Sequence, residues 1–228
     1  MLASVHLADI GVRRALSLRR RSVDPASIAG LRWASPLIAQ PLRSSFRPAL
    51  AFKRLGLVTF WDDAGSLDAF ESQHRVARLF EDGWRARLVP LRAFGAWPGL
   101  DSETPRPRHI DEDGPAVVLT LGRLRVSQAV RFLRTSAKAE AAARSAPGLI
   151  WASGLARPPF VATCSLWQGQ DAIAAYAYGG GGAHPGAISV DRAKAFHHES
   201  AFIRFRPVAE SGGLAGRNPL PAGSLGLS

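Results

Sequence analysis

Gly30-Leu31-Arg32-Trp33-Ala34-Ser35-Pro36-Leu37 has a second copy in the same chain, Gly148-Leu149-Ile150-Trp151-Ala152-Ser153-Gly154-Leu155. Both copies follow the pattern Gly-Leu-x-Trp-Ala-Ser-x-Leu. A long motif that occurs twice indicates one supersecondary unit used twice. Chance similarity between two apolar strands is the alternative, but the glycine and the tryptophan recur in matching places.

The segments around the two copies keep the same order. The apolar run 57–61 follows the first copy, and the slightly longer run 161–167 follows the second. The strand-like segments 84–90 and 201–207 close the two series, and both end on proline. The loops therefore differ in length between the halves, whereas the order of parts is kept.

Length and composition bound the class of protein. The chain has 228 residues, of which 46% are hydrophobic, which suits one large domain or two domains of about 100 residues. No window approaches the ~20 apolar residues of a membrane span, and charged residues interrupt the N-terminus before any signal-peptide core. Cys164 is the single cysteine, which excludes an internal disulfide. We predict a cytoplasmic protein, with peripheral membrane attachment left open.

The net charge of +11 comes almost entirely from arginine, because lysine occurs at Lys53, Lys138 and Lys194 alone. The run Arg19-Arg20-Arg21 would suit nucleic acid or an anionic membrane surface. A solvated helix face is the simpler interpretation. No aromatic interleaving, helix-turn-helix or zinc-finger pattern accompanies the arginines, so we predict no nucleic-acid partner.

Hydrophobic periodicity predicts the same elements in both halves. The expected strands are 3–10, 31–39, 55–61, 84–93, 116–121, 149–156, 160–167 and 201–207. The expected helices are 12–21, 66–83, 127–145 and 171–178, with a further helical piece around 186–198. Ser66 is the expected N-cap of the second helix. The spacing of Val126, Val130, Leu133 and Ala137 predicts a stripe that faces the core.

Each half thus has the order β-α-β-β-α-β, which is the ferredoxin-like plan of the α+β class. We expect the two tandem halves to pack sheet to sheet as a unit like a dimeric α/β barrel. Residues 1–97 form the first half, and 98–115 form a linker rich in proline and glycine. Residues 116–210 form the second half, which carries the candidate site, and 211–228 form an irregular tail.

The histidines offer the candidate chemistry. No multi-histidine metal motif is present, and the adjacent His197 and His198 would point about 100° apart on a helix. A single histidine is nevertheless enough for an axial haem ligand. His184, which follows four glycines, faces a pocket or lies on a surface loop. His197, beside Phe196, is a site residue or a half-buried histidine at a helix end.

Arg204 and Arg206 lie one strand period apart, so their side chains share a face of the last strand. Two guanidinium groups on one face need anions, such as haem carboxylates or carboxylates of the other half. Edge-strand salt bridges are the alternative. Thr163-Cys164-Ser165 lacks a His/Asp arrangement, so Cys164 is interpreted as a small buried residue rather than a nucleophile.

Several motifs resemble those of the spheroidene monooxygenases. The stretch 148–167 is similar to the signature of that family, as are Arg134-Thr135-Ser136-Ala137, Tyr176-Ala177-Tyr178-Gly179 and 200–207. The resemblance is dense over residues 116–220 and thinner over 30–99. The arginine-rich N-terminal third and the glycine run at 179–182 depart from the pattern.

The resemblance implies a carotenoid oxygenase that uses O₂ and reduced ferredoxin, contains haem, and has a dimeric α/β-barrel fold. It makes His184 and His197 candidate haem-iron ligands, and Arg204 and Arg206 candidate partners of the haem propionates. The candidate wall of the substrate pocket is Trp151, Phe160, Trp167 and Tyr176. We therefore expect a monooxygenase acting on an apolar polyene. The alternative is a non-catalytic ligand-binding or stress-related protein on the same scaffold, and homo-oligomerisation stays open.

Overall fold

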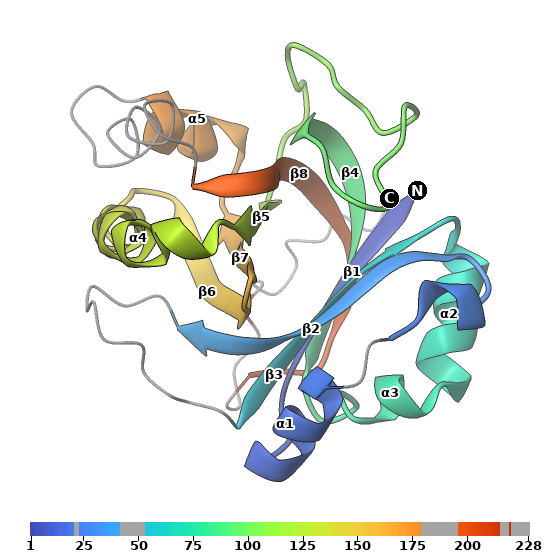
Figure 1. Cartoon of the computed structure of the whole chain (residues 1–228). Coiled ribbons are helices and arrows are strands. Elements are labelled where there is room, and N and C mark those ends of the chain that lie inside the picture. Colours follow the sequence, from blue (N-terminus) through green and yellow to red (C-terminus); the bar gives the residue numbers. More distant parts are fainter. Residues whose placement is uncertain (21–22, 42–52, 179–195, 215–218, 220–228) are drawn as a thin grey trace.

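Antiparallel strands close into a barrel in the computed structural model, which describes residues 1–20, 23–41, 53–178, 196–214 and 219 (Figure 1). The strands are β1 (Leu2–Asp9), β2 (Leu31–Pro41), β3 (Arg54–Trp61), β4 (Trp84–Gly95), β5 (Ala116–Leu124), β6 (Leu149–Arg157), β7 (Phe160–Trp167) and β8 (His197–Ser211). The helices are α1 (Val12–Arg20), α2 (Ala64–Gln73), α3 (Arg75–Arg78), α4 (Ala129–Arg144) and α5 (Gln170–Tyr178), with 3-10 turns η1 (Pro25–Ser27) and η2 (Val126–Gln128).

The barrel order is β1-β3-β2-β6-β7-β5-β8-β4. Within each half the strands have the same order, 4-1-3-2 for the first and 8-5-7-6 for the second. The two sheets are joined through antiparallel pairs of equivalent edge strands, β2 with β6 and β4 with β8. The predicted α+β fold of two ferredoxin-like halves in a barrel-like unit is confirmed, and closure leaves neither sheet with a free edge.

The repeated motif forms the same turn in both halves. Gly30 and Gly148 have φ of +70° and +81°, a left-handed conformation that favours glycine. A Cβ on Gly30 would collide with Ser66 at the start of α2, and a Cβ on Gly148 would collide with Ala172 at the start of α5. The glycine therefore lets the chain pass directly over the first turn of a helix, twice.

A register shift follows each glycine at the same place in the motif. It lies between Leu31 and Trp33 in the β2–β3 pair and between the corresponding Leu149 and Trp151 in the β6–β7 pair. An extra residue in one strand bends it and increases its twist. Both motif tryptophans pack against the apolar interior of the barrel. Two copies with one local structure confirm that one supersecondary unit is used twice.

Side chains fill the inside of the barrel. The buried cluster there draws alternate residues from the strands, such as Ala3, Val5 and Leu7 of β1, as expected for a strand with one inward face. Cys164 belongs to this cluster, and burial raises the pKa of its thiol to about 12. The interpretation of Cys164 as a small buried residue is confirmed.

The predicted helix over 66–83 is divided at His74, which ends α2 and begins α3. The imidazole Nδ1 of His74 accepts a hydrogen bond from the Val76 N–H at 3.2 Å, so this side chain caps α3. The N-cap of α2 is Asp63 rather than the predicted Ser66. The Asp63 carboxylate accepts the N–H of Ser66 at 2.8 Å, because a carboxylate caps a helix N-terminus well.

The predicted core-facing stripe of α4 is wrong. Val126 of η2 and Val130 and Leu133 of α4 are 82%, 58% and 41% exposed, and Ala137 is half-buried. Among the described side chains of α4, Ala143 alone is buried, and Phe132 points to the protein side, where it meets His197. Periodicity identifies one face of a helix but does not say which neighbour, if any, covers it. None of the helices in the described part of the chain is long and apolar enough to span a membrane.

A buried polar network lies between the first sheet and α2. His6 Nε2 lies 2.8 Å from Ser4 Oγ, which lies 2.6 Å from Thr59 Oγ1. Glu71 forms an ion pair with Arg87 and places its other carboxylate oxygen 3.9 Å from His6 Nε2. Because His6 is fully enclosed, this side of the first half is a sealed layer rather than a site.

Protonation of His6 should destabilise the fold. Burial, followed by the charges of Arg85 and Arg87, lowers its pKa from 6.5 to about 3. The folded state therefore disfavours the imidazolium. The stability that comes from keeping His6 neutral is fully present above pH 6.5 and is lost as the pH falls toward 3. We expect a loss of up to about 1.4 kcal/mol of unfolding free energy per pH unit. Urea denaturation of the wild type and of His6→Gln at pH 7, 6 and 5 measures it. His109→Gln, at an exposed histidine, is the control. An unchanged pH slope in His6→Gln would contradict the assignment.

Candidate functional site

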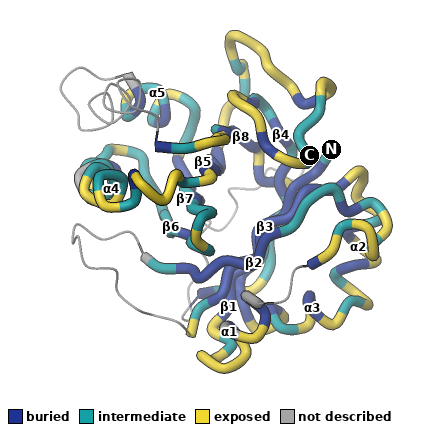
Figure 2. The backbone as a smooth tube through the Cα atoms, viewed as in Figure 1, coloured by how far each residue is buried: buried dark blue, intermediate teal, exposed yellow. Residues whose placement is uncertain are grey.

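The helical layers of the two halves are packed very differently. Fifteen buried apolar residues form the layer beneath α1, α2 and α3, whereas the described residues of the layer beneath α4 and α5 include four, which are Ala116, Val118, Trp167 and Ile173. Figure 2 shows the contrast as a dark blue sheet beside an α4 that is teal and yellow. Thr120, in the middle of β5 with strands on both sides, is exposed. Among the described residues, the outer face of the second sheet therefore has fewer buried apolar residues over it than that of the first, and Thr120 is exposed on it.

His197 lies at the edge of this layer. It is the first residue of β8 and pairs with Leu124 of β5, and its imidazole rests on the outer face of β5. A Cβ on Gly122 would lie 2.6 Å from His197 Nε2, so the ring occupies the space that glycine leaves free. The Phe132 ring of α4 meets it edge-on at 5.3 Å. Arg125 Nε donates a hydrogen bond to the His197 carbonyl at 3.2 Å.

The two predicted iron ligands have different outcomes. His184 lies outside the described residues, as does most of the helical piece predicted around 186–198. Residue 197 belongs to a strand rather than to a helix. The sequence missed this because the register shift between Arg123 and Leu124 hides the alternation at the start of β8.

The two candidate arginines share the outer face of β8 but have different surroundings. Arg204 is 7% exposed, and its NH1 donates to the Gln170 amide oxygen of α5 at 3.3 Å. Its guanidinium carbon also lies 5.8 Å from the centre of the Phe202 ring. Arg206 is exposed and pairs with Glu112 at 2.9 Å. The salt-bridge interpretation holds for Arg206, and Arg204 is a nearly buried cation beside α5.

The four predicted pocket-wall residues lie on opposite faces of the sheet. Trp151 and Phe160 pack on the barrel interior, where the Trp151 ring is 5.5 Å from that of Trp84. Trp167 and Tyr176 lie outside, with ring centres 5.1 Å apart. The structure thus brings Trp167 and Tyr176 together beneath α5 and separates them from the other two.

Tyr176 links the two helices of the second half. Its hydroxyl donates to the Ala139 carbonyl of α4 at 3.2 Å. Burial, and then the nearby charge of Glu140, raises the pKa of Tyr176 to about 12, so the phenol stays neutral. Trp167, beneath it, donates its indole N–H to Ser165 Oγ at 2.9 Å. These bonds fix α5 and part of α4 over one end of the sheet.

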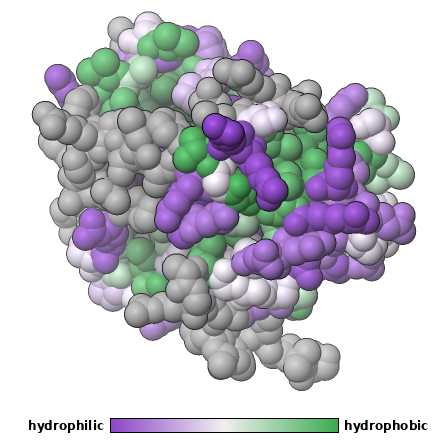
Figure 3. Space-filling model, turned by 90° about the horizontal axis from the view of Figure 1, so that it is seen from below, coloured by the Kyte–Doolittle hydropathy of each residue, from purple (hydrophilic) through white to green (hydrophobic). Residues whose placement is uncertain are grey.

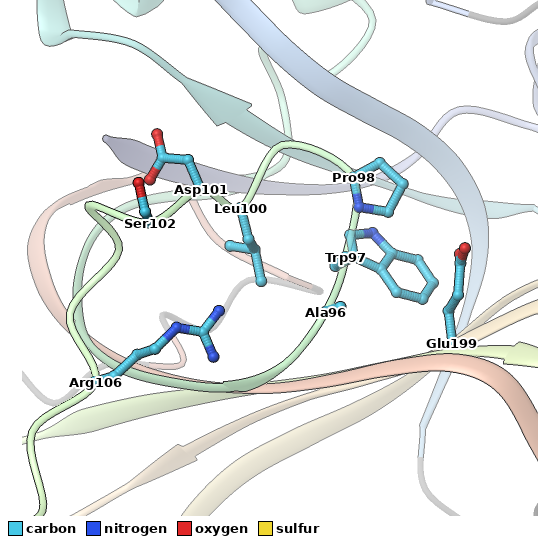
Figure 4. Close-up of a pocket in the computed structure, with 8 residues that line it drawn as sticks. All are labelled: Ala96, Trp97, Pro98, Leu100, Asp101, Ser102, Arg106 and Glu199. Atoms are coloured by element: carbon cyan, nitrogen blue, oxygen red, sulfur yellow. The ribbon is translucent and has the colours of Figure 1, made fainter.

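One pocket was not predicted from the sequence. A cavity of about 360 Å³ lies beside the 98–115 segment and is lined by Ala96, Trp97, Pro98, Leu100, Asp101, Ser102, Arg106 and Glu199. Figure 4 shows Arg106 and Glu199 at its opposite sides. Arg106 NH1 donates to the Gly95 carbonyl at 3.2 Å. Proline and glycine in this segment predicted an exposed connection, and composition gives no sign of a hollow.

Comparisons with known proteins establish the fold. No family of sequences and no curated protein matches the chain. An aldoxime dehydratase solved with butyraldoxime is 10% identical, with a TM-score of 0.54 over 90% of this chain and 79% of that one. A heme-degrading enzyme from Listeria monocytogenes is 13% identical (TM-score 0.32; 88% and 98% covered). A monooxygenase-like protein from Listeria innocua is 14% identical (TM-score 0.31; 89% and 94% covered). At such identities the likeness shows the fold alone.

Gly122→Ala should displace the His197 ring. The new Cβ has no room beside the imidazole, so we expect a loss of about 1–3 kcal/mol in the free energy of unfolding, measured by urea denaturation. Gly169→Ala is the matched control, since its nearest neighbour is a carbonyl oxygen at 3.7 Å, and it should cost under about 0.5 kcal/mol. His197→Ala combined with Gly122→Ala should recover most of the loss, because the clash is gone. Strictly additive effects would show that the ring does not rest on Gly122.

Proposed function

We propose that this chain is a haem-dependent monooxygenase whose active site lies between α4, α5 and the outer face of the second sheet. One observation carries the proposal: the imidazole of His197 rests on Gly122, beside a layer in which four of the described apolar residues are buried. The equivalent layer of the first half has fifteen, so the described parts of the two halves differ on this face.

The described residues suit a haem. A haem needs one axial side chain, which is why a site can exist although the described residues contain no group of three metal-ligating side chains. His197 supplies an imidazole, and Phe132 and Phe196 place aromatic rings around it. Arg204 is a permanent cation on the same face of the sheet, suited to a propionate. His184 remains a second candidate ligand on the resemblance alone.

When bound, the haem iron would supply the activation of O₂, and the chain would supply position and shielding. Gly122 and Phe132 hold the His197 ring against β5, and Arg125 fixes its backbone. The hydroxyl of Tyr176 keeps α4 and α5 together over the sheet. These contacts would orient the axial ligand and limit the access of water.

The substrate class and the electron donor come from the resemblance to the spheroidene monooxygenases. It implies an apolar polyene, oxidised with O₂ and reduced ferredoxin. The fold shared with the aldoxime dehydratase is compatible with an enzyme of this architecture, since fold alone does not fix function. An apolar substrate beside the cofactor would lie over the outer face of β5, where Thr120 is exposed.

His197→Ala should abolish or shift the Soret band of protein expressed with a supply of haem, because the axial bond is lost. His198→Ala is the matched control: it is the next residue, it is exposed, and its band should equal that of the wild type. Absorption spectra of the oxidised and reduced forms provide the measurement. His184→Ala, in parallel, assigns the alternative ligand.

The outcomes separate the proposal from its rival. If His197→Ala has the spectrum of the wild type, His197 is not the haem ligand. Wild-type protein that neither carries haem nor binds added haemin would favour a non-catalytic ligand-binding protein. For haem-loaded protein, O₂-dependent oxidation of a linear carotenoid with reduced ferredoxin tests the reaction.

A further inference from the structure

The apolar face of α4 points away from the protein. Val130 and Leu133 lie three residues apart on one face of α4, Val126 lies in η2 just before the helix, and all three are exposed. Phe132, on the other side of the helix, contacts His197 and Phe196. A surface helix of a globular protein normally has the reverse orientation. Figure 3, a view from below, shows that hydrophobic side chains reach the surface of the molecule among hydrophilic ones.

The stripe lies in a basic stretch of the chain. No aspartate or glutamate occurs from residue 114 to 139, whereas Arg123, Arg125, Arg131, Arg134 and Lys138 do. Glu140 is the one acidic residue within α4. Arg125 and Arg134 are exposed beside the stripe. Glu199 lies opposite Arg123 in the β5–β8 pair.

Charge and side-chain type select among the partners that could cover this face. A second copy of the chain would bring arginines against arginines. Protein interfaces are rich in aromatic residues and methionine at their centre, which the aliphatic stripe lacks. An apolar stripe beside arginines is typical of a helix that lies in the headgroup region of an anionic bilayer. We propose that η2 and α4 dock this protein on an anionic phospholipid surface.

Docking in this orientation would place the candidate site directly behind the membrane-facing helix, because Phe132 and the stripe lie on opposite sides of α4. An apolar polyene is dissolved in the bilayer, so the substrate of the proposed function would have a short path to the candidate site. The docking itself rests on exposure and charge, and it does not require that the protein bind haem.

Flotation with lipid vesicles tests the docking. We expect the full chain to bind vesicles that contain phosphatidylglycerol and to bind pure phosphatidylcholine far more weakly. Val130→Glu should weaken binding about tenfold or more, since it removes buried apolar area and adds an anion at an anionic surface. Val12→Glu on α1 is the matched control, because it makes the same substitution at a valine of similar exposure, 47% against 58%. It should bind as the wild type does.

Two further variants separate a specific dock from general attraction. Arg134→Gln should weaken binding about fivefold, and Val130→Leu should bind at least as tightly as the wild type. Circular dichroism and thermal melting confirm that each variant is folded. The proposal is overturned if the wild type does not bind anionic vesicles, or if Val12→Glu and Val130→Glu lose binding equally. It is also overturned if sedimentation shows a wild-type dimer that Val130→Glu dissociates. Vesicle binding by protein without a Soret band would uphold the dock while the haem proposal fails.

Discussion

The fold depends on one backbone position that is used twice, the left-handed glycine at the start of the repeated motif. Gly30 and Gly148 each pass so close to a helix that a Cβ has no room. The Gly30 carbonyl also accepts the N–H of Asp62, and the Gly148 carbonyl accepts the N–H of Gln168, both at 2.8 Å. This turn sets the register of the bulge after it, and the bulge aims Trp33 or Trp151 at the barrel. The pairing of β2 with β6, which joins the halves, follows from strands placed in this way.

Equivalent scaffolds have acquired different outer layers. The indoles of Trp61 and Trp167 each donate to a hydroxyl two residues earlier, and each packs against an aromatic residue of the following helix at 5.1 Å. Beyond these shared contacts, the first half encloses a polar network around His6. The second half has Thr120 exposed on the outer face of β5. The two halves therefore share one scaffold, and the candidate site lies in the half whose outer layer differs.

The sequence predicts the parts of this structure that depend on local pattern. Alternation placed every strand within a few residues, and the repeated glycine and tryptophan identified the two halves. Prediction from the sequence failed where packing against a neighbouring layer decides which residues are buried. Periodicity located the stripe of Val126, Val130 and Leu133 but assumed that a core covers it. The pocket beside Trp97 is formed by a loop whose composition says only that it is exposed. His197 was found by residue type, whereas its seat on Gly122 depends on pairing between distant strands.

The orientation of α4 connects the candidate site to the exposed stripe. Had this helix turned Val130 and Leu133 inward, they would have packed on the protein side of α4, where Phe132 meets His197. In the observed orientation, the apolar residues Val130 and Leu133 of α4 face away from the protein. Exposing aliphatic side chains to water is unfavourable in proportion to their area, so a lasting arrangement of this kind calls for a surface that covers them. An anionic bilayer would cover the apolar stripe and pair with the arginines beside it. The orientation of α4 would then explain both the candidate site behind the helix and the path of an apolar substrate from the bilayer to that site.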